Sequence, residues 1–329
     1  MDSVVPGVGV DQPEHTGLGH VFRVGLDAAG RSRHALFFLV LSAASRLPLG
    51  LAYAFARRLG RIRHGGLRRD LRVNEDAVRA LGGTPEQIDG WARLACELSA
   101  SETMESHLLP RLADGSLERL IRIEGLEHLE AALAGGKGAI LYSLHVRGQY
   151  TLFAALAKLG HAPSIVGRRP VDGMIPSDRR FRQWRYSVLE ERFGCRCIWM
   201  GPENFGVAVK AANVLRENGV VVMFVDSLHR KLGVEVSFLE GRWRFTSGPA
   251  LLAKTTGAPM LDFYVHRGEG WFPQVAEIGA PLAPCDSLAE VTQACATRLE
   301  QHVRGHPAQW KFFSRYEGSD VANPRVKAM

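Results

Sequence analysis

The sequence predicts an α/β protein with a central, mostly parallel or mixed sheet flanked by helices. Two apolar runs, 139–144 and 220–225, have the length of buried strands, and a glycine precedes each of them. A helix with apolar positions at helical spacing follows the first run, at 150–159. Strand-length and helix-length segments continue to alternate as far as residue 303, which is typical of one sheet with helices packed on its faces.

Residues 34–110 are expected to form a helical region that contacts a membrane. The preceding leader, 1–33, lacks any period and is expected to be mobile. The most apolar stretch, 35–55, is long enough to span a bilayer, but Arg46 and Pro48 fall at its centre. An arginine there costs about 2.5–3.5 kcal/mol on insertion scales, so we expect two shorter helices lying in the interface. The alternative is a hydrophobic helix packed on the domain.

A basic flank follows this apolar stretch. Each basic side chain near an anionic surface adds about 1 kcal/mol of attraction, which favours membrane contact. Helix is expected over 74–109, with Thr84 as an N-cap and Pro85 in the first turn. The flank consists of Arg57, Arg58, Arg61, Arg63, His64, Arg68, Arg69 and Arg72.

The α/β domain is expected over 111–318, with a flexible tail at 319–329. The glycine-rich turn 135–138 lacks the residue order of a P-loop and is expected to end a helix and begin a strand. Besides the two runs above, the segments expected from their patterns are a strand and helix within 121–134, strands at 162–166, 234–238, 241–246, 259–266 and 271–278, and helices at 205–218, 249–256 and 289–303.

The composition favours a globular protein with a substantial core. The chain has 329 residues, of which 46% are apolar and 23% are charged. Its net charge of +7 suits an anionic membrane, phosphorylated substrates or nucleic acid. Nucleic acid is the weakest of these partners, because the arginines lack interleaved aromatic residues. The five cysteines, with Cys195 and Cys197 one residue apart, match no metal or redox motif, so reduced thiols and a cytosolic face are expected.

Polar residues directly follow the two apolar strands. His145 comes after the first, and Asp226 comes after the second in a loop that also holds Arg230. In α/β folds the carboxyl ends of the strands carry the chemistry, so these residues are candidate catalytic groups. The alternative is a hydrogen-bonded imidazole that closes a strand-to-helix turn. Arginines at 168–169 and 179–185 suit phosphate or carboxylate recognition, or else form a solvated basic face.

Several segments occur in an order that is more specific than any one of them. They are the apolar, basic-flanked N-terminal stretch, Gly136-Lys-Gly-Ala-Ile-Leu before His145, Arg169-Pro170, Asp226, Thr256-Gly-Ala-Pro259 and His306-Pro-Ala-Gln-Trp310. Together they resemble the lysophospholipid acyltransferase superfamily, in particular its bacterial lipid A (lauroyl/myristoyl) acyltransferase branch. The resemblance runs from about residue 35 to Trp310.

The resemblance implies a histidine followed by an acidic residue five positions later. Histidine takes the proton of an acceptor hydroxyl, and the carboxylate fixes its tautomer and stabilises the imidazolium. Here the histidine is His145, but the fifth position is Tyr150, which is neutral near pH 7. Three outcomes follow: another carboxylate, such as Asp226 or Glu105, takes the role; His145 acts as a lone base; or the chain binds without transferring.

The resemblance therefore implies an acyltransferase that moves a fatty acyl group from acyl carrier protein or acyl-CoA to a hydroxyl of a lipid A-type or specialised amphiphilic acceptor. The alternative is a non-catalytic relative that binds a carrier protein or lipid. No metal or bound cofactor is implied, because the thioester carries the activation. Expected partners are acyl carrier protein and the inner membrane, whose cytoplasmic face the chain would meet peripherally or through one N-terminal anchor. Candidate site residues are His145, Tyr150 and Asp226 for catalysis, and Arg147, Gln149, Arg168, Arg169 and Arg230 for substrate binding.

Overall fold

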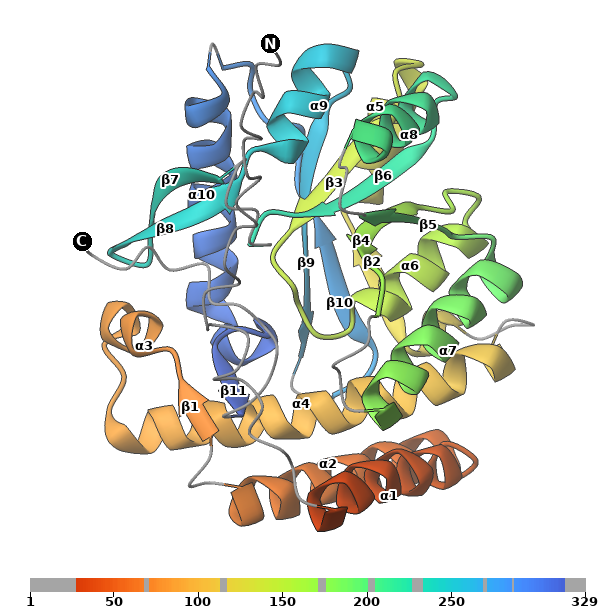
Figure 1. Cartoon of the computed structure of the whole chain (residues 1–329), viewed down its shortest axis with the longest axis vertical. Helices are drawn as coiled ribbons and strands as arrows, with labels where there is room; N and C mark the ends of the chain where they lie inside the picture. The colour runs from red at the N-terminus through yellow and green to blue at the C-terminus, as the bar shows by residue number, and fades with distance from the viewer. Residues whose placement is uncertain are drawn as a thin grey trace, which may run out of the picture.

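A computed structural model describes residues 28–67, 71–112, 117–170, 176–200, 205–226, 233–268, 271–285 and 287–316. A seven-stranded sheet lies at its centre, with helices on both faces and a layer of N-terminal helices along one edge (Figure 1). The expected tail and most of the expected leader lie outside the described residues. The first helix nevertheless begins at Ala28, inside the stretch that was expected to be mobile.

The central sheet is mixed and mostly parallel, which confirms the predicted fold class. Strands β9, β3, β6, β4 and β5 run parallel to one another, whereas β10 is antiparallel to β9 and parallel to β2. The sheet order is β2 (Ile121–Glu124), β10 (Gln274–Ile278), β9 (Met260–Arg267), β3 (Ala139–Ser143), β6 (Val220–Phe224), β4 (Ser164–Arg168) and β5 (Arg196–Met200). Strand β5 was not predicted; it is a short, partly exposed strand in which only Ile198 is buried.

Helices cover both faces of this sheet. On one side α6 packs against α7 and α4, and on the other α9 packs against both α8 and α10. The hairpin of β7 (Gly233–Phe238) and β8 (Gly241–Thr246) packs on α10. The helices of the domain are α5 (Leu126–Ala134), α6 (Gln149–Lys158), α7 (Pro176–Phe193), α8 (Phe205–Arg216), α9 (Gly248–Thr256) and α10 (Leu288–Gly305), with short 3₁₀ turns at Leu117–Arg119 and Pro307–Gln309.

The N-terminal apolar stretch forms two helices that meet at Pro48, as its sequence predicts. Helix α2 packs along the long helix α4, which runs beneath the sheet and separates it from α1 and α2 (Figure 1). The two helices approach so closely that a Cβ at Gly60 would lie 2.5 Å from the Glu97 Cα. The bounds are α1 (Ala28–Ala44), α2 (Leu49–Leu67), α3 (Glu75–Leu81) and α4 (Pro85–Leu112), and β1 (Leu71–Val73) pairs with β11 (Ser314–Tyr316).

Buried ion pairs join these layers. On β9, Arg267 donates to Glu105 of α4, and the Tyr53 hydroxyl of α2 donates to the same carboxylate over 2.6 Å. Asp262, also on β9, accepts from Arg298 and His302 of α10. Burial would raise the pKa of Asp262, but these hydrogen bonds outweigh burial and hold the pKa below its usual value. Both networks tie helices to the sheet.

His107 of α4 lies in an aromatic cluster beneath α7. Its ring stacks on Trp184 at 4.7 Å and tilts against Phe181 at 5.4 Å. Burial, together with the nearby charge of Arg46, lowers the pKa of His107 to about 4, so the ring is neutral at pH 7. Among the described residues no helix is both long and apolar enough to cross a membrane.

Candidate active site

The register of the two central strands brings His145 and Asp226 together. Strands β3 and β6 are parallel neighbours, and Ser143 pairs with Phe224 at their carboxyl ends. Two residues further along each chain come His145 and Asp226, so the candidate groups that followed two separate apolar runs lie side by side. This is the sheet edge at which the sequence predicted chemistry.

Asp226 is fully buried and accepts three hydrogen bonds. Its Oδ1 lies 2.6 Å from His145 Nδ1, while Oδ2 accepts the His145 backbone N–H at 2.9 Å and the Trp310 Nε1–H at 3.1 Å. An ionised carboxylate can only accept, so the proton of the neutral imidazole is on Nδ1. This leaves Nε2 as the nitrogen that can take a proton.

The imidazole of His145 is held between aromatic rings and remains partly open to solvent. It stacks on Phe224 at 4.3 Å and tilts against Phe312 at 5.4 Å, and 30% of its side chain is exposed. A histidine with a buried carboxylate on Nδ1 and an accessible Nε2 can remove a proton from a hydroxyl and then stabilise its own positive charge. Of the three outcomes left open for Tyr150, the geometry favours a carboxylate from elsewhere, namely Asp226.

The C-terminal segment fixes the loop 145–148. Val146 pairs with Trp310 in an antiparallel bridge, and the Lys311 N–H donates to the His145 carbonyl at 2.8 Å. Arg147, expected to bind substrate, is buried, and its Nη1 donates to the carbonyls of Ala308 and Trp310 at 2.7 and 3.1 Å. The geometry therefore gives Arg147 a structural task, that of holding the segment whose Trp310 contacts Asp226.

Tyr150 lies at the start of α6 beneath two cations. The guanidinium of Arg185 is 3.5 Å from the centre of its ring, and the Lys311 ammonium is 4.9 Å away. Burial would raise the pKa of Tyr150, but the charges of Arg185 and Lys311 outweigh burial and hold the pKa below its usual value. Its neighbour Gln149, the other expected contact from this helix, is almost wholly buried.

The remaining candidates come from other parts of the chain. Arg168 ends β4 and is exposed at the same sheet edge, and Arg169 follows it over the ring of Trp199 at 5.9 Å. Glu105, the other carboxylate considered as a partner for His145, is occupied by Arg267 and Tyr53 instead. Arg230 lies outside the described residues.

Three residues at this site were not singled out from the sequence. Trp310 donates to Asp226, and its place in the His306–Trp310 segment was the only signal. Glu102 and Lys311 form an ion pair of 2.9 Å beside the loop 145–148, and no local pattern marks either one. Within the described ranges, no group of three or more His, Cys, Asp or Glu side chains could hold a metal ion.

The imidazole of His145 is paired with a buried aspartate at the carboxyl edge of a mixed α/β sheet. This arrangement is typical of a transferase or hydrolase that uses a general base. The family model described as bacterial lipid A biosynthesis acyltransferase matches residues 40–316. The chain belongs to this family, and it is an acyltransferase that transfers acyl chains to lipid acceptors.

The chain is also similar to curated proteins from mycobacteria. It is 30% identical over 277 residues to the phosphatidylinositol mannoside acyltransferase of Mycobacterium tuberculosis (strain CDC 1551 / Oshkosh), covering 80% of this chain and 81% of that protein. It is 27% identical over 273 residues to the protein of the same name from Mycolicibacterium smegmatis, covering 80% of this chain and 83% of that one.

Proposed function

We propose that the protein moves a fatty acyl group from the thioester of acyl carrier protein or acyl-CoA to a hydroxyl of a membrane lipid, with His145 as the general base. The observation that carries this proposal is the contact of 2.6 Å between His145 Nδ1 and the buried carboxylate of Asp226. The names of the mycobacterial relatives support an acceptor whose headgroup carries sugar or polyol hydroxyls.

In the proposed reaction the acceptor O–H gives its proton to His145 Nε2 as its oxygen attacks the thioester carbonyl carbon. The new C–O bond forms and the C–S bond breaks. The imidazolium, stabilised by Asp226, returns the proton to the leaving sulfur, so that an ester and a free thiol are released. Trp310 keeps the carboxylate oriented through its Nε1–H.

Arg168 and Arg169 are proposed to hold a phosphate of the donor or acceptor. Both are exposed, and β4 lies next to β6, whose end carries Asp226. Guanidinium groups suit this task because their paired N–H donors match phosphate oxygens. A basic surface also suits an acidic carrier protein as the partner that brings the acyl chain.

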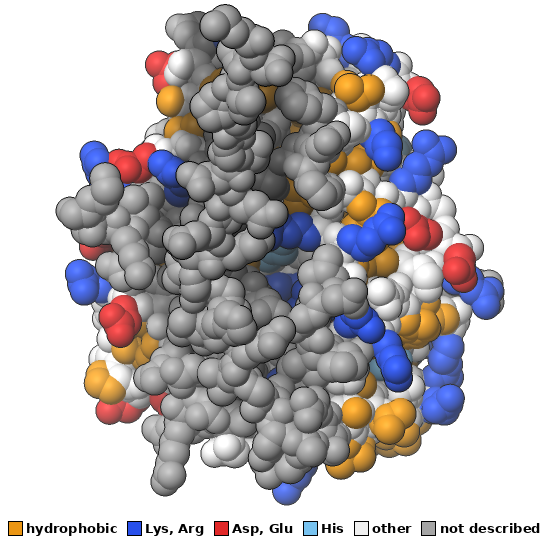
Figure 2. All heavy atoms as spheres, viewed as in Figure 1, with side chains coloured by type: hydrophobic (Ala, Val, Ile, Leu, Met, Phe, Trp, Pro, Cys, Tyr) orange, Lys and Arg blue, Asp and Glu red, His pale blue; other side chains and the backbone are white. Residues whose placement is uncertain are grey.

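The outer face of α1 and α2 is proposed to rest on the cytoplasmic leaflet of the inner membrane. Apolar side chains gather at the lower edge of the molecule, where these helices lie (Figure 2). On α2, Leu51, Phe55 and Ile62 recur at helical spacing on one face, and the exposed Arg58 lies among them. Exposed large apolar residues of α1, α2 and the turn between them are Leu36, Leu39, Leu47, Leu51, Phe55 and Ile62.

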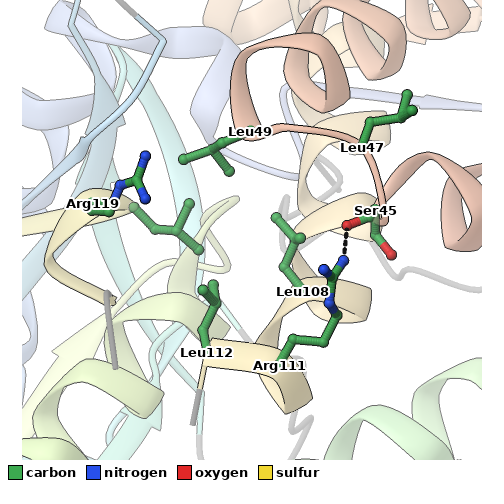
Figure 3. A pocket seen from close by; sticks show the side chains of 8 residues that line it. Ser45, Leu47, Leu49, Leu108, Arg111, Leu112 and Arg119 are labelled. Carbon is green, nitrogen blue, oxygen red and sulfur yellow. Dashed lines mark hydrogen bonds between the residues drawn. The ribbon is translucent and has the colours of Figure 1, made fainter. Parts of the chain in front are cut away.

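A hollow of about 230 Å³ between the α1–α2 turn and the end of α4 supports the same orientation. Leucines line it, and the guanidinium groups of Arg111 and Arg119 lie at opposite sides (Figure 3). Arg111 also donates to the Ser45 carbonyl over 2.6 Å, which fixes the turn. Leucine side chains beside two guanidinium groups match an anionic lipid, since the leucines can contact its first methylenes and the arginines its phosphate.

The proposed chemistry is tested with purified protein, an acyl-CoA or acyl carrier protein donor and a bacterial lipid extract, with thiol release and acylated lipid measured together. We expect His145→Ala to lower product formation by about 10⁴-fold, at the upper end of general-base contributions. His161→Ala, which changes a histidine in the turn after α6, is the matched control and is expected to retain activity. Equal product from wild type and His145→Ala would refute the role of His145 and favour a protein that only binds.

The membrane surface is tested by sedimentation with vesicles of phosphatidylcholine and phosphatidylglycerol. Leu51→Glu and Ile62→Glu are each expected to weaken binding by about tenfold, because each removes one leucine-sized apolar contact. Val209→Glu changes an equally exposed apolar residue on α8 and should not weaken binding. Equal losses from all three variants would contradict a defined membrane face.

A further inference from the structure

A carboxylate from the N-terminal layer reaches the loop that carries His145. Glu102 projects from α4, and one of its oxygens, Oε1, accepts both from the Gly148 N–H at 3.2 Å and from the Lys311 ammonium at 2.9 Å. Lys311 in turn donates its backbone N–H to the His145 carbonyl. The contacts therefore form a closed ring that runs from Glu102 through Gly148 and His145 to Lys311 and back.

The ring joins three parts of the chain that are distant in sequence. Glu102 comes from α4, the loop 145–148 links β3 to α6, and Lys311 follows the segment that orients Asp226. Gly148 adopts a positive φ of 89°, and a Cβ there would collide with Gln274 Oε1, so this turn has little freedom to move. The carboxylate also lies at the N-terminus of α6, where the helix dipole favours a negative charge.

Glu102 is the acidic partner for the cations around Tyr150. The side chain of Glu102 is 12% exposed and that of Lys311 is 23% exposed, and Arg185 lies over the adjacent Tyr150 ring. Burial would raise the pKa of Glu102, but the charges of Lys311 and Arg185 outweigh burial and hold the pKa below its usual value. The carboxylate of Glu102 is therefore ionised at neutral pH. It supplies the negative charge that the aromatic side chain of Tyr150 does not.

We propose that Glu102 is a positioning residue of this acyltransferase, whose ion pair with Lys311 and hydrogen bond from Gly148 hold the loop 145–148 so that His145 Nε2 meets the acceptor hydroxyl. Glu102 does not touch the reacting atoms. It acts through the loop, and so it affects the chemical step rather than substrate binding. This role rests on the proposed function, since it presumes that His145 is the base.

The first experiment is a double-mutant cycle in the thiol-release assay with Glu102→Gln, Lys311→Met and the double variant. We expect Glu102→Gln to lower kcat by about 30-fold with KM for the acceptor changed less than about threefold, because small misplacements of a catalytic group cost up to about 100-fold. If the two residues act as one pair, the double variant loses no more than the worse single variant. Losses that multiply, or a kcat within threefold of wild type for Glu102→Gln, would overturn the proposal.

The second experiment moves the carboxylate. An aspartate at position 150 would lie beside Arg185 and Lys311, so in a Tyr150→Asp background the loss caused by Glu102→Gln should shrink from about 30-fold to about threefold. An unchanged 30-fold loss would contradict the proposal that a negative charge at this place positions the loop 145–148. If Tyr150→Asp does not fold, the cycle with Lys311→Met decides the question.

Glu105→Gln is the matched control on the same helix. It also removes a buried carboxylate with a cationic partner, but Glu105 accepts from Arg267 and Tyr53 and not from the loop 145–148, so Glu105→Gln should lower the melting temperature and leave kcat unchanged. Hydrogen exchange separates this proposal from the proposed reaction. In Glu102→Gln, amides of the peptide 144–150 should exchange faster whether or not the protein transfers acyl groups. If the wild type is inactive and exchange in Glu102→Gln is unchanged, both proposals fail. If the wild type is inactive but exchange in Glu102→Gln rises, the positioning role of Glu102 stands and the proposed reaction fails.

Discussion

The most informative single change is Asp226→Asn, which keeps the shape of the side chain and removes its charge. The structure determines how the amide must sit. Oδ2 accepts two N–H groups, from the His145 backbone and from Trp310, so the amide oxygen has to remain on that side. The amide NH₂ then faces His145 Nδ1, which must become an acceptor, and the proton of the neutral ring moves to Nε2. The nitrogen that should accept the substrate proton is thereby blocked.

The size of the effect follows from this geometry. Losing only the charge on a hydrogen bond to the imidazolium would cost roughly 1.5–3 kcal/mol. Reversing the tautomer is worse, and the equivalent change in a serine-protease triad lowers turnover by about 10⁴-fold. Because the fixed donors at Oδ2 leave the amide no alternative orientation, we expect a fall in kcat of about 10⁴-fold, or about 5.4 kcal/mol at 1.36 kcal/mol per decade.

The assay is the initial rate of thiol release at saturating donor, with the acylated lipid identified by mass spectrometry. Asp262→Asn is the matched control, since Asp262 is also a buried carboxylate that accepts from a histidine, His302, but it lies away from His145. It should lower stability and leave kcat within a few-fold of wild type. Retention of more than about a tenth of the wild-type rate by a folded Asp226→Asn protein would refute the assignment of Asp226 as the partner of His145.

Three further predictions concern stability. The pKa of His107 is lowered to about 4, so between about pH 6.5 and 4 the unfolded chain binds a proton that the folded chain does not. Stability therefore decreases as the pH is lowered through that window, and in His107→Phe the melting temperature should change less with pH there. The pKa of Asp262 is lower in the folded than in the unfolded protein, so the stabilisation from this carboxylate is present above the unfolded pKa. Thermal unfolding should therefore show Asp262→Asn to be less stable than the wild type at pH 7, with the difference closing only below about pH 4. Arg267→Met leaves Glu105 buried without its cation and should cost about 3 kcal/mol in urea unfolding, with part recovered in the double variant with Glu105→Gln; full stability of the single variant would contradict the importance of this pair.

The parts of the fold that the sequence predicted are those with strong local patterns. The apolar runs that became β3 and β6 have glycine before them and polar residues after them, so both their extent and the position of His145 and Asp226 at their ends were readable. The proline at the centre of the apolar N-terminal stretch likewise predicted two helices rather than one. Strand β5 was missed because it is short and partly exposed, with Ile198 as its one buried residue, and β1 and β11 were missed because three-residue strands carry too little pattern.

The parts that the sequence could not predict depend on which strands become neighbours. Asp226 was one of two carboxylates considered as the partner of His145, the other being Glu105, because the sequence does not say that β6 lies next to β3 or that their register aligns His145 with Asp226. Arg147 was expected at the substrate, since arginine usually serves anions, but the turn directs it inward to the carbonyls of Ala308 and Trp310. Side-chain direction in a turn is decided by contacts that form only when distant segments meet.

By itself, the sequence determined the α/β class, the family and the histidine at the end of a central strand, because these depend on residue order and on patterns within a few positions. Only the tertiary structure decided which carboxylate serves that histidine, that Trp310 orients this carboxylate, and that Glu102 and Lys311 close around the loop. Asp226 lies 81 positions from His145 and 84 positions from Trp310 along the chain. No local sequence pattern specifies contacts between residues so far apart.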